Sequence, residues 1–345
     1  RVHQMCREFP QLFMQFSKSV DYEHDPQWYK GIEYPNEQER GFEFKEDLLV
    51  PGYFELPMKK GESVIFAAGI TEVKTRTLKT TWEKEMTRRI ARENMFACLK
   101  NSAGQFYKRE GDKCYLLSGY PWYHAEARAT FFSTPSCTLD IDRPEYWEAI
   151  IDQTAVDEIR NFLAGHTGMV KMTGMDDPDA LLWAVRAFQK YAHKYTVREA
   201  AEKYGDLCAD IIAFYRKQNH PRAYLHQNGL LWVDGTQRPA TWMSAVENGR
   251  PITPRTGYVV EINALWYNAL RFTAELLREK GNQEAADLLD FQAEITRGAF
   301  VNTFWNGLYL YDYVVDGYQD REVRPNQIWA AGLPYSPLDR KQQKA

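Results

Sequence analysis

The stretch "TWMSAVENGRPITPRTGYVVEINALWYNAL", from Thr241 to Leu270, decides the fold class of this chain. Its first half is rich in Gly, Pro and polar residues and predicts a loop, whereas its second half is apolar and aromatic. A loop that leads into such a helix usually carries chemistry. Continued to residue 277, the second half predicts a helix with one apolar stripe, formed by Leu265, Trp266, Ala269, Leu270, Thr273, Leu276 and Leu277.

The helical period continues on both sides of this stretch. One helix has a clear start signal, with Asp177 as N-cap, Pro178 in the first turn and Asp179 behind it. We expect about eight helices after residue 80, and one long loop over residues 219–259. Before residue 73 the chain has short apolar runs separated by turn residues, which predicts strands. The sequence therefore predicts the end of a β-sandwich domain over residues 1–75 and a helical domain over residues 76–345.

The composition is that of a soluble globular protein, with 345 residues, 44% apolar and 26% charged. The net charge of −4 and the lack of a basic tract argue against nucleic acid and anionic membranes as partners. The five cysteines are scattered and the seven histidines have no metal-ligand spacing, so we expect a cytoplasmic protein without metal or cofactor. The high aromatic share, 14%, fits either a well-filled core or a cleft that stacks sugars on Trp and Tyr.

Several segments resemble bacterial glycogen debranching enzymes of the amylo-α-1,6-glucosidase family. The resemblance covers nearly the whole chain from Trp28 onward, and its most specific part is "TPRTGYVVEINALWYNAL". The other segments appear in the order of the family and are "WYKGIEYPNEQERGFEFKEDLLVPGYFEL", "SGYPWYHAEARATFF", "DALLW", "NGLLWVDG", "TWMS" and "RPNQIWA".

The resemblance implies a mainly α fold, an (α/α)6 toroid of glucoamylase type preceded by the end of a β-sandwich. It also implies an activity, removal of a glucose stub at an α-1,6 branch point of glycogen. Inverting hydrolysis needs a carboxylic acid that protonates the leaving oxygen and a carboxylate that activates water. The acid needs a raised pKa, which partial burial normally provides.

The chain departs from the family pattern at three places. The resemblance implies an Asp as general acid after "TWM", where this chain has Ser244, and a serine hydroxyl cannot protonate a leaving group at neutral pH. The family has Trp-Gly-Arg-Asp where this chain has Glu126, Ala127, Arg128 and Ala129, so a sugar-binding Asp is replaced. The third departure concerns the general base, which the family carries near an "HQG"-type segment that this sequence does not contain.

Other carboxylates near the cleft are candidates to replace the missing acid. Glu126, Asp234, Glu247 and Glu261 flank it, although a rim carboxylate is the favoured interpretation of Glu126. Glu261 is alternatively a carboxylate that orients the loop or caps the helix start. Arg255 either binds a sugar hydroxyl or forms a buried ion pair with Glu261. The remaining candidates for substrate binding are Trp122, Arg128, Asp179, Asp234, Trp242, Arg324, Asn326 and Gln327, while Trp266 and Tyr267 are expected in the core.

These residues leave three functions open. The chain is a debranching-type hydrolase, a divergent paralogue that binds α-glucan without cutting it, or a related (α/α)6 enzyme for another sugar. For the first two, the expected partner is an α-glucan or glycogen oligosaccharide. Since a six-hairpin toroid needs more helices than we expect here, the last helices and the general base are expected beyond Ala345. A C-terminal segment or a second chain would then complete the ring.

Overall fold

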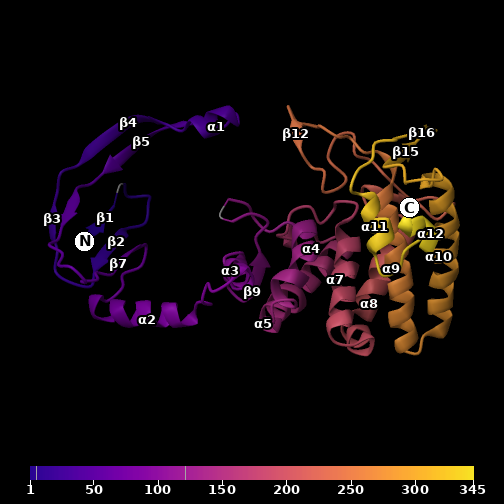
Figure 1. The fold of residues 1–345 in the computed structure, drawn as a ribbon, viewed down its shortest axis with the longest axis horizontal. Helices are drawn as coiled ribbons and strands as arrows, with labels where there is room; N and C mark the ends of the chain where they lie inside the picture. Colours follow the sequence, from indigo (N-terminus) through magenta and orange to yellow (C-terminus); the bar gives the residue numbers. More distant parts are fainter. Residues whose placement is uncertain (5, 121) are drawn as a thin grey trace. The chain divides into compact units, whose positions relative to one another are not determined.

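The computed structural model describes residues 1–4, 6–120 and 122–345. The chain divides into two compact units, Arg1–Cys98 and Leu99–Ala345. The first unit is rich in strands and the second is mainly helical (Figure 1). The predicted fold class, mainly α after a strand-rich N-terminal segment, is confirmed. That the helical ring is incomplete within these residues stays a prediction.

The described residues of unit 1 form short antiparallel strands, the α-helices α1 and α2, the 3₁₀ turn η1 and the start of a further helix. Strands β1, β2 and β7 form one sheet, and β3–β6 and β4–β5 form two-stranded ladders. The ring of Phe16 contacts the rings of Phe54 and Phe66, at centroid distances of 4.8 and 4.7 Å. The elements are β1 (Val2–His3), β2 (Leu12–Phe16), β3 (Asp21–Glu23), β4 (Gln27–Glu33), α1 (Pro35–Glu39), β5 (Lys45–Val50), β6 (Tyr53–Glu55), β7 (Phe66–Gly69), η1 (Thr75–Thr77) and α2 (Leu78–Arg88).

Unit 2 is built from paired helices whose connecting segments carry short strands. Helix α3 (Met95–Ala103) spans the boundary between the units. The helices of unit 2 are α4 (Ala127–Thr138), α5 (Pro144–Trp147), α6 (Val156–Leu163), α7 (Ala180–Lys194), α8 (Val197–Arg216), α9 (Val260–Glu279), α10 (Gln283–Phe304), α11 (Gln327–Gly332) and α12 (Arg340–Lys344). A π-helical turn, η2 (Glu148–Ala155), joins α5 to α6, and η3 (Thr167–Met169) follows.

Helix α9 is the centre of unit 2. It packs against α7, α8, α10 and α11 (Figure 1), and both Trp266 and Tyr267 are buried in the core, as expected. The sequence predicted an apolar stripe, but burial extends to other faces and includes Asn263 and Asn268. Their side chains form hydrogen bonds there; the Asn263 amide, for example, accepts from the backbone N–H of Leu231 at 2.8 Å. A helix that is buried on nearly all sides provides a rigid support for the loops at its ends.

Residues 219–259, predicted as a long loop, contain five of the strands. Three of them belong to a five-stranded antiparallel sheet of order β10-β11-β14-β15-β16, and two form a small separate hairpin. The prediction of a continuous loop is therefore wrong in part. The strands of unit 2 are β8 (Tyr107–Glu110), β9 (Lys113–Leu116), β10 (Ala223–Leu225), β11 (Leu231–Val233), β12 (Val246–Glu247), β13 (Arg250–Pro251), β14 (Gly257–Val259), β15 (Tyr313–Val315) and β16 (Tyr318–Gln319).

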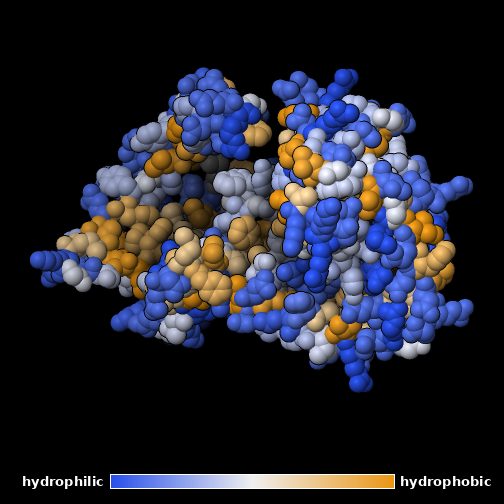
Figure 2. Space-filling model, turned by 45° about the vertical axis from the view of Figure 1, so that its right-hand side comes forward, coloured by the Kyte–Doolittle hydropathy of each residue, from blue (hydrophilic) through white to orange (hydrophobic). Residues whose placement is uncertain are grey.

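The surface combines hydrophilic areas with hydrophobic patches (Figure 2). Leu288, Phe291 and Ile295 of α10 are exposed at helical spacing, so they share one face of that helix. Among the described residues, no helix has both the length and the apolar character to cross a membrane.

Candidate functional site

The first part of the candidate site is a buried charge cluster around Arg255. Arg255, Glu261 and Asp312 are each at most 2% exposed. Both oxygens of Glu261 accept hydrogen bonds from Arg255, Oε2 from Nη2 at 2.7 Å. Asp312 Oδ1 accepts from Nη2 at 2.8 Å, and Asp312 Oδ2 lies 2.7 Å from Nε. Burial lowers the pKa of Arg255, but the two carboxylates outweigh it and the net shift is upward.

This cluster fixes two neighbouring residues of the loop between β11 and β14 (residues 234–256), called the site loop below. Arg255 Nη1 donates to Thr241 Oγ1 at 3.1 Å, which holds the start of the "TWMS" segment. On the other side, the buried amide of Asn326 donates to Asp312 Oδ1 at 2.7 Å and accepts from Trp242 Nε1 at 2.8 Å. Trp242 is thereby oriented while its side chain stays 50% exposed.

Two further predicted residues border this cluster. Arg324 Nη1 donates to Asp312 Oδ2 at 3.0 Å and to Asp320 Oδ1 at 2.9 Å. Gln327, the first residue of α11, accepts from the backbone N–H of Leu310 at 3.2 Å. Both side chains therefore connect α11 and its preceding loop to the strand segment that carries Asp312.

The second part of the candidate site is a charge cluster around Arg128, which lies in the first turn of α4. Its Nε donates to both oxygens of Asp179 at 3.0 and 2.9 Å, its Nη2 to Asp177 Oδ2 at 2.9 Å, and its Nη1 to Glu126 Oε1 at 3.0 Å. Asp179 also accepts from Trp183 Nε1 at 3.1 Å. Burial raises the pKa of Glu126, opposed by Arg128 and reinforced by the neighbouring aspartates.

The start signal read from the sequence for α7 is wrong. The helix begins at Ala180, so Asp179 occupies the N-cap position, and neither its side chain nor that of Asp177 caps the helix. Both carboxylates are instead used by Arg128. A buried arginine needs compensating carboxylates, and this requirement outweighs the local preference of Asp for a helix start.

Asp234 lies, in the sequence, between the residues of the Arg128 cluster and those of the Arg255 cluster. Its carboxylate accepts from the backbone N–H and the hydroxyl of Thr236, at 2.8 and 2.7 Å, and these hydrogen bonds lower the pKa of Asp234. Gly235 follows, where an added Cβ would lie 2.3 Å from the backbone oxygen of Arg255. The backbone segments at residues 235 and 255 are thus in such close contact that a side chain at residue 235 would collide with the other segment. Only glycine fits there.

The remaining predicted residues lie in exposed positions. Ser244 is exposed and its backbone N–H donates to the Trp242 carbonyl at 2.8 Å. Glu247 lies in β12, also exposed. Trp122 is 79% exposed, and Pro121, which precedes it in the quoted segment, lies outside the described residues.

Sequence reasoning missed two residues that organise the site. Asp312 interrupts the run "LYLYDYVV", and a carboxylate inside an aromatic strand segment is a signal for a buried ion pair. Arg222 follows "NHP" and has no comparable signal, although its guanidinium contacts Asp177 and the loop after Asp234. For Arg255, of the two alternatives that the sequence left open, the structure contains the buried ion pair with Glu261.

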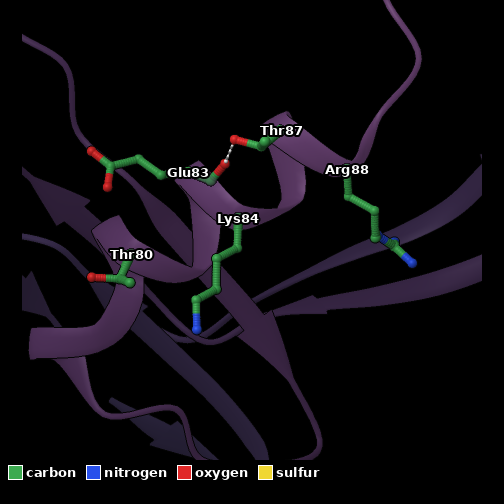
Figure 3. A pocket seen from close by; sticks show the side chains of 5 residues that line it. All are labelled: Thr80, Glu83, Lys84, Thr87 and Arg88. Atoms are coloured by element: carbon green, nitrogen blue, oxygen red, sulfur yellow. Dashed lines mark hydrogen bonds between the residues drawn. The ribbon is translucent and has the colours of Figure 1, made fainter.

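A shallow pocket of about 400 Å³ lies elsewhere, on helix α2 of unit 1 (Figure 3). Its lining side chains are spread along one helix, and the Thr87 hydroxyl donates to the Glu83 carbonyl at 2.9 Å. None of its lining residues is among the predicted site residues; they are Thr80, Glu83, Lys84, Thr87 and Arg88. Within the described part of the chain, no three His, Cys, Asp or Glu side chains are grouped as a metal ion would require.

Comparison with known families defines the class of protein. Residues 100–345, more than half of the chain, match the family described as "Amylo-alpha-1,6-glucosidase", and the chain therefore belongs to that family. Residues 2–65 match the family described as "Glycogen debranching enzyme N terminal". The two matches together identify the chain as glycogen debranching enzyme-like.

Among solved structures, a bacterial glucoamylase complexed with acarbose is similar to this chain, with 12% sequence identity and a TM-score of 0.49. The similarity covers 95% of this chain and 54% of the glucoamylase chain, so this chain spans about half the length of that protein. No curated protein sequence matches the chain.

Proposed function

We propose that this chain binds an α-glucan at the loops of unit 2 and acts on α-1,6-linked glucose, as its family name describes. The observation that carries this proposal is the Trp242 ring, which is half exposed yet held by Asn326 and, behind it, by buried Asp312. A flat apolar surface fixed in orientation suits the apolar face of a sugar, because little entropy is lost when the sugar binds.

For hydrolysis, we propose Glu126 as the proton donor. Glu261 has both oxygens bound by Arg255, and the hydrogen bonds of Thr236 lower the pKa of Asp234, which favours its charged form. Glu126 is partly exposed, has one oxygen on Arg128, and has a raised pKa. A general acid needs to be protonated near the operating pH, and a raised pKa favours this.

A second candidate function is glucan binding without hydrolysis. It is favoured by the side chain at the position of the family acid, Ser244, whose hydroxyl is too weak an acid to protonate a leaving group at neutral pH. Under this alternative Trp242 has the same role, and Glu126 serves only to balance the charge of Arg128.

The binding proposal is tested on Trp242. We expect Trp242→Ala to weaken binding of panose, a trisaccharide with one α-1,6-linked glucose, by about tenfold, because the stacking surface is removed. Binding is measured by titration calorimetry on the full-length protein. Phe291→Ala is the matched control, because Phe291 is an exposed aromatic on the outer helix α10. Equal losses in the two variants, or none in either, would contradict the proposal.

The proton-donor proposal predicts a pH dependence. Because burial raises the pKa of Glu126, its acid form persists to higher pH than that of an ordinary glutamate. Glucose release from a branched limit dextrin should be present below this pKa and decline as the pH rises through it. In Glu126→Gln this decline should disappear together with the activity. An unchanged pH profile and rate in that variant would exclude Glu126 as the proton donor, whereas a parent protein that binds panose but releases no glucose at any pH would favour binding without hydrolysis.

A further inference from the structure

Arg222 makes several contacts to the site loop that no local sequence pattern predicts. It lies between α8 and β10, and its side chain is 14% exposed. Its Nη1 donates to Asp177 Oδ1 at 2.7 Å. Its Nη2 lies within hydrogen-bond distance of three backbone carbonyl oxygens of one loop, those of Arg238 at 2.7 Å, Pro239 at 2.8 Å and Asp234 at 3.3 Å.

This arrangement is suited to holding residues 234–245, which contain no helix or strand. Carbonyl groups outside helices and sheets need donors when they are partly buried. A guanidinium has planar, pre-oriented N–H groups and supplies several of them from one side chain, which an ammonium group cannot do in the same geometry. Because the donor is charged, each of these hydrogen bonds is stronger than one between neutral groups.

The carbonyl groups bound by Arg222 lie directly before the residues of the candidate site. Pro239 is three residues before Trp242 and five before Ser244. Arg255 holds Thr241 from the other side. The segment Pro239–Thr241 is therefore fixed at both ends, whereas residues 244–250 are exposed.

Asp177 connects this loop anchor to the Arg128 cluster. Its Oδ2 accepts from Arg128, and its Oδ1 accepts from Arg222 and, at 3.0 Å, from Arg238. One carboxylate thus joins the start of α4, which carries the Arg128–Glu126 pair, to the loop that carries Trp242. A displacement of Arg222 would alter both parts of the site.

We propose that Arg222 is a positioning residue, which sets the placement of Trp242 and residue 244 relative to the Arg128 cluster by holding the carbonyl groups of residues 234, 238 and 239. It acts through the loop backbone. The inference rests on the proposed α-glucan site and names the residue that holds the loop of that site in place.

The test uses full-length protein with Arg222→Ala and Arg222→Lys, and Arg238→Met as the matched control. Arg238 is an arginine of the same loop that also contacts Asp177, but its side chain bonds none of the three carbonyls. We expect panose affinity to fall roughly tenfold in both Arg222 variants, since hydrogen bonds to a charged donor are lost. The loss should be smaller in Arg238→Met. Addition of ethylguanidinium at millimolar concentration should restore part of the affinity of Arg222→Ala, and should not affect Arg238→Met.

Hydrogen–deuterium exchange provides a second readout that does not depend on the sugar. In Arg222→Lys, which keeps a positive charge beside Asp177, amide exchange should increase over residues 235–247 and stay unchanged in α9. Unchanged exchange in the loop, or panose affinity equal to that of the parent protein, would overturn the assignment. If the parent protein does not bind panose, the proposed function fails, and the exchange measurement still decides whether Arg222 holds the loop. If Arg222→Ala does not fold, Arg222→Lys alone gives both readouts.

Discussion

Arg255→Leu is expected to lower the free energy of unfolding by about 3–5 kcal/mol, the usual cost of removing one partner from a buried ion pair. The substitution leaves Glu261 and Asp312 without their common counter-charge in a region that water does not reach. It also removes the donor to Thr241, so the site loop loses one of its anchors. Chemical denaturation of the parent and the variant measures the difference directly.

Arg297→Leu is the control for this prediction. Arg297 pairs with Glu294 on the outside of α10, and both side chains are about half exposed. Such a surface pair contributes about 0–1 kcal/mol. If the two variants lose the same stability, the Arg255 cluster does not have the structural role that its burial indicates.

Ser244→Asp is expected to increase glucose release from a branched limit dextrin, because it places a carboxyl group at the position of the family acid, whereas Glu126 acts from another position. The full contribution of a general acid, about 10²–10⁴-fold, is the upper bound of the increase. Ser244 lies two residues after the fixed Trp242 ring, so a carboxyl group there is placed by the same loop. The initial rate of the full-length protein, with and without the substitution, is the measurement.

The double variant Ser244→Asp with Glu126→Gln is the control. If the carboxyl group introduced at residue 244 becomes the proton donor, loss of Glu126 should matter much less in this background than in the parent protein. A Ser244→Asp variant that still binds panose but releases glucose no faster than its parent would show that the missing acid is not what limits the reaction.

The regular elements of this chain could be predicted from the sequence because they depend on local periodicity. The helix after residue 260 follows from the spacing of its apolar residues, and the strand-rich N-terminal segment follows from its turns. The short strands within residues 219–259 could not be predicted, because each has only two or three residues, which is too short for a periodic signal. The strand β14, moreover, pairs with β15, far along the chain.

In the candidate site, too, contacts between residues near in sequence could be anticipated, whereas contacts between distant residues could not. The pairing of Arg255 with Glu261 was one of two alternatives, since the residues are six positions apart at a helix start. Asp312 and Arg222 were not identified, because their partners lie 57 and 45 residues away and only the tertiary fold brings them together. The N-cap role predicted for Asp177 is wrong because its carboxylate is bound by Arg128, which lies on α4, 49 residues away.

The central claim is that an α-1,6-linked glucose binds against Trp242. The position of panose in crystals of the full-length protein tests it most directly. We expect a glucose ring to lie flat against the Trp242 indole, with its glycosidic oxygen turned toward Ser244 and Glu126. Panose bound on unit 1 or on the outer surface of α10, with Trp242 free, would contradict the account.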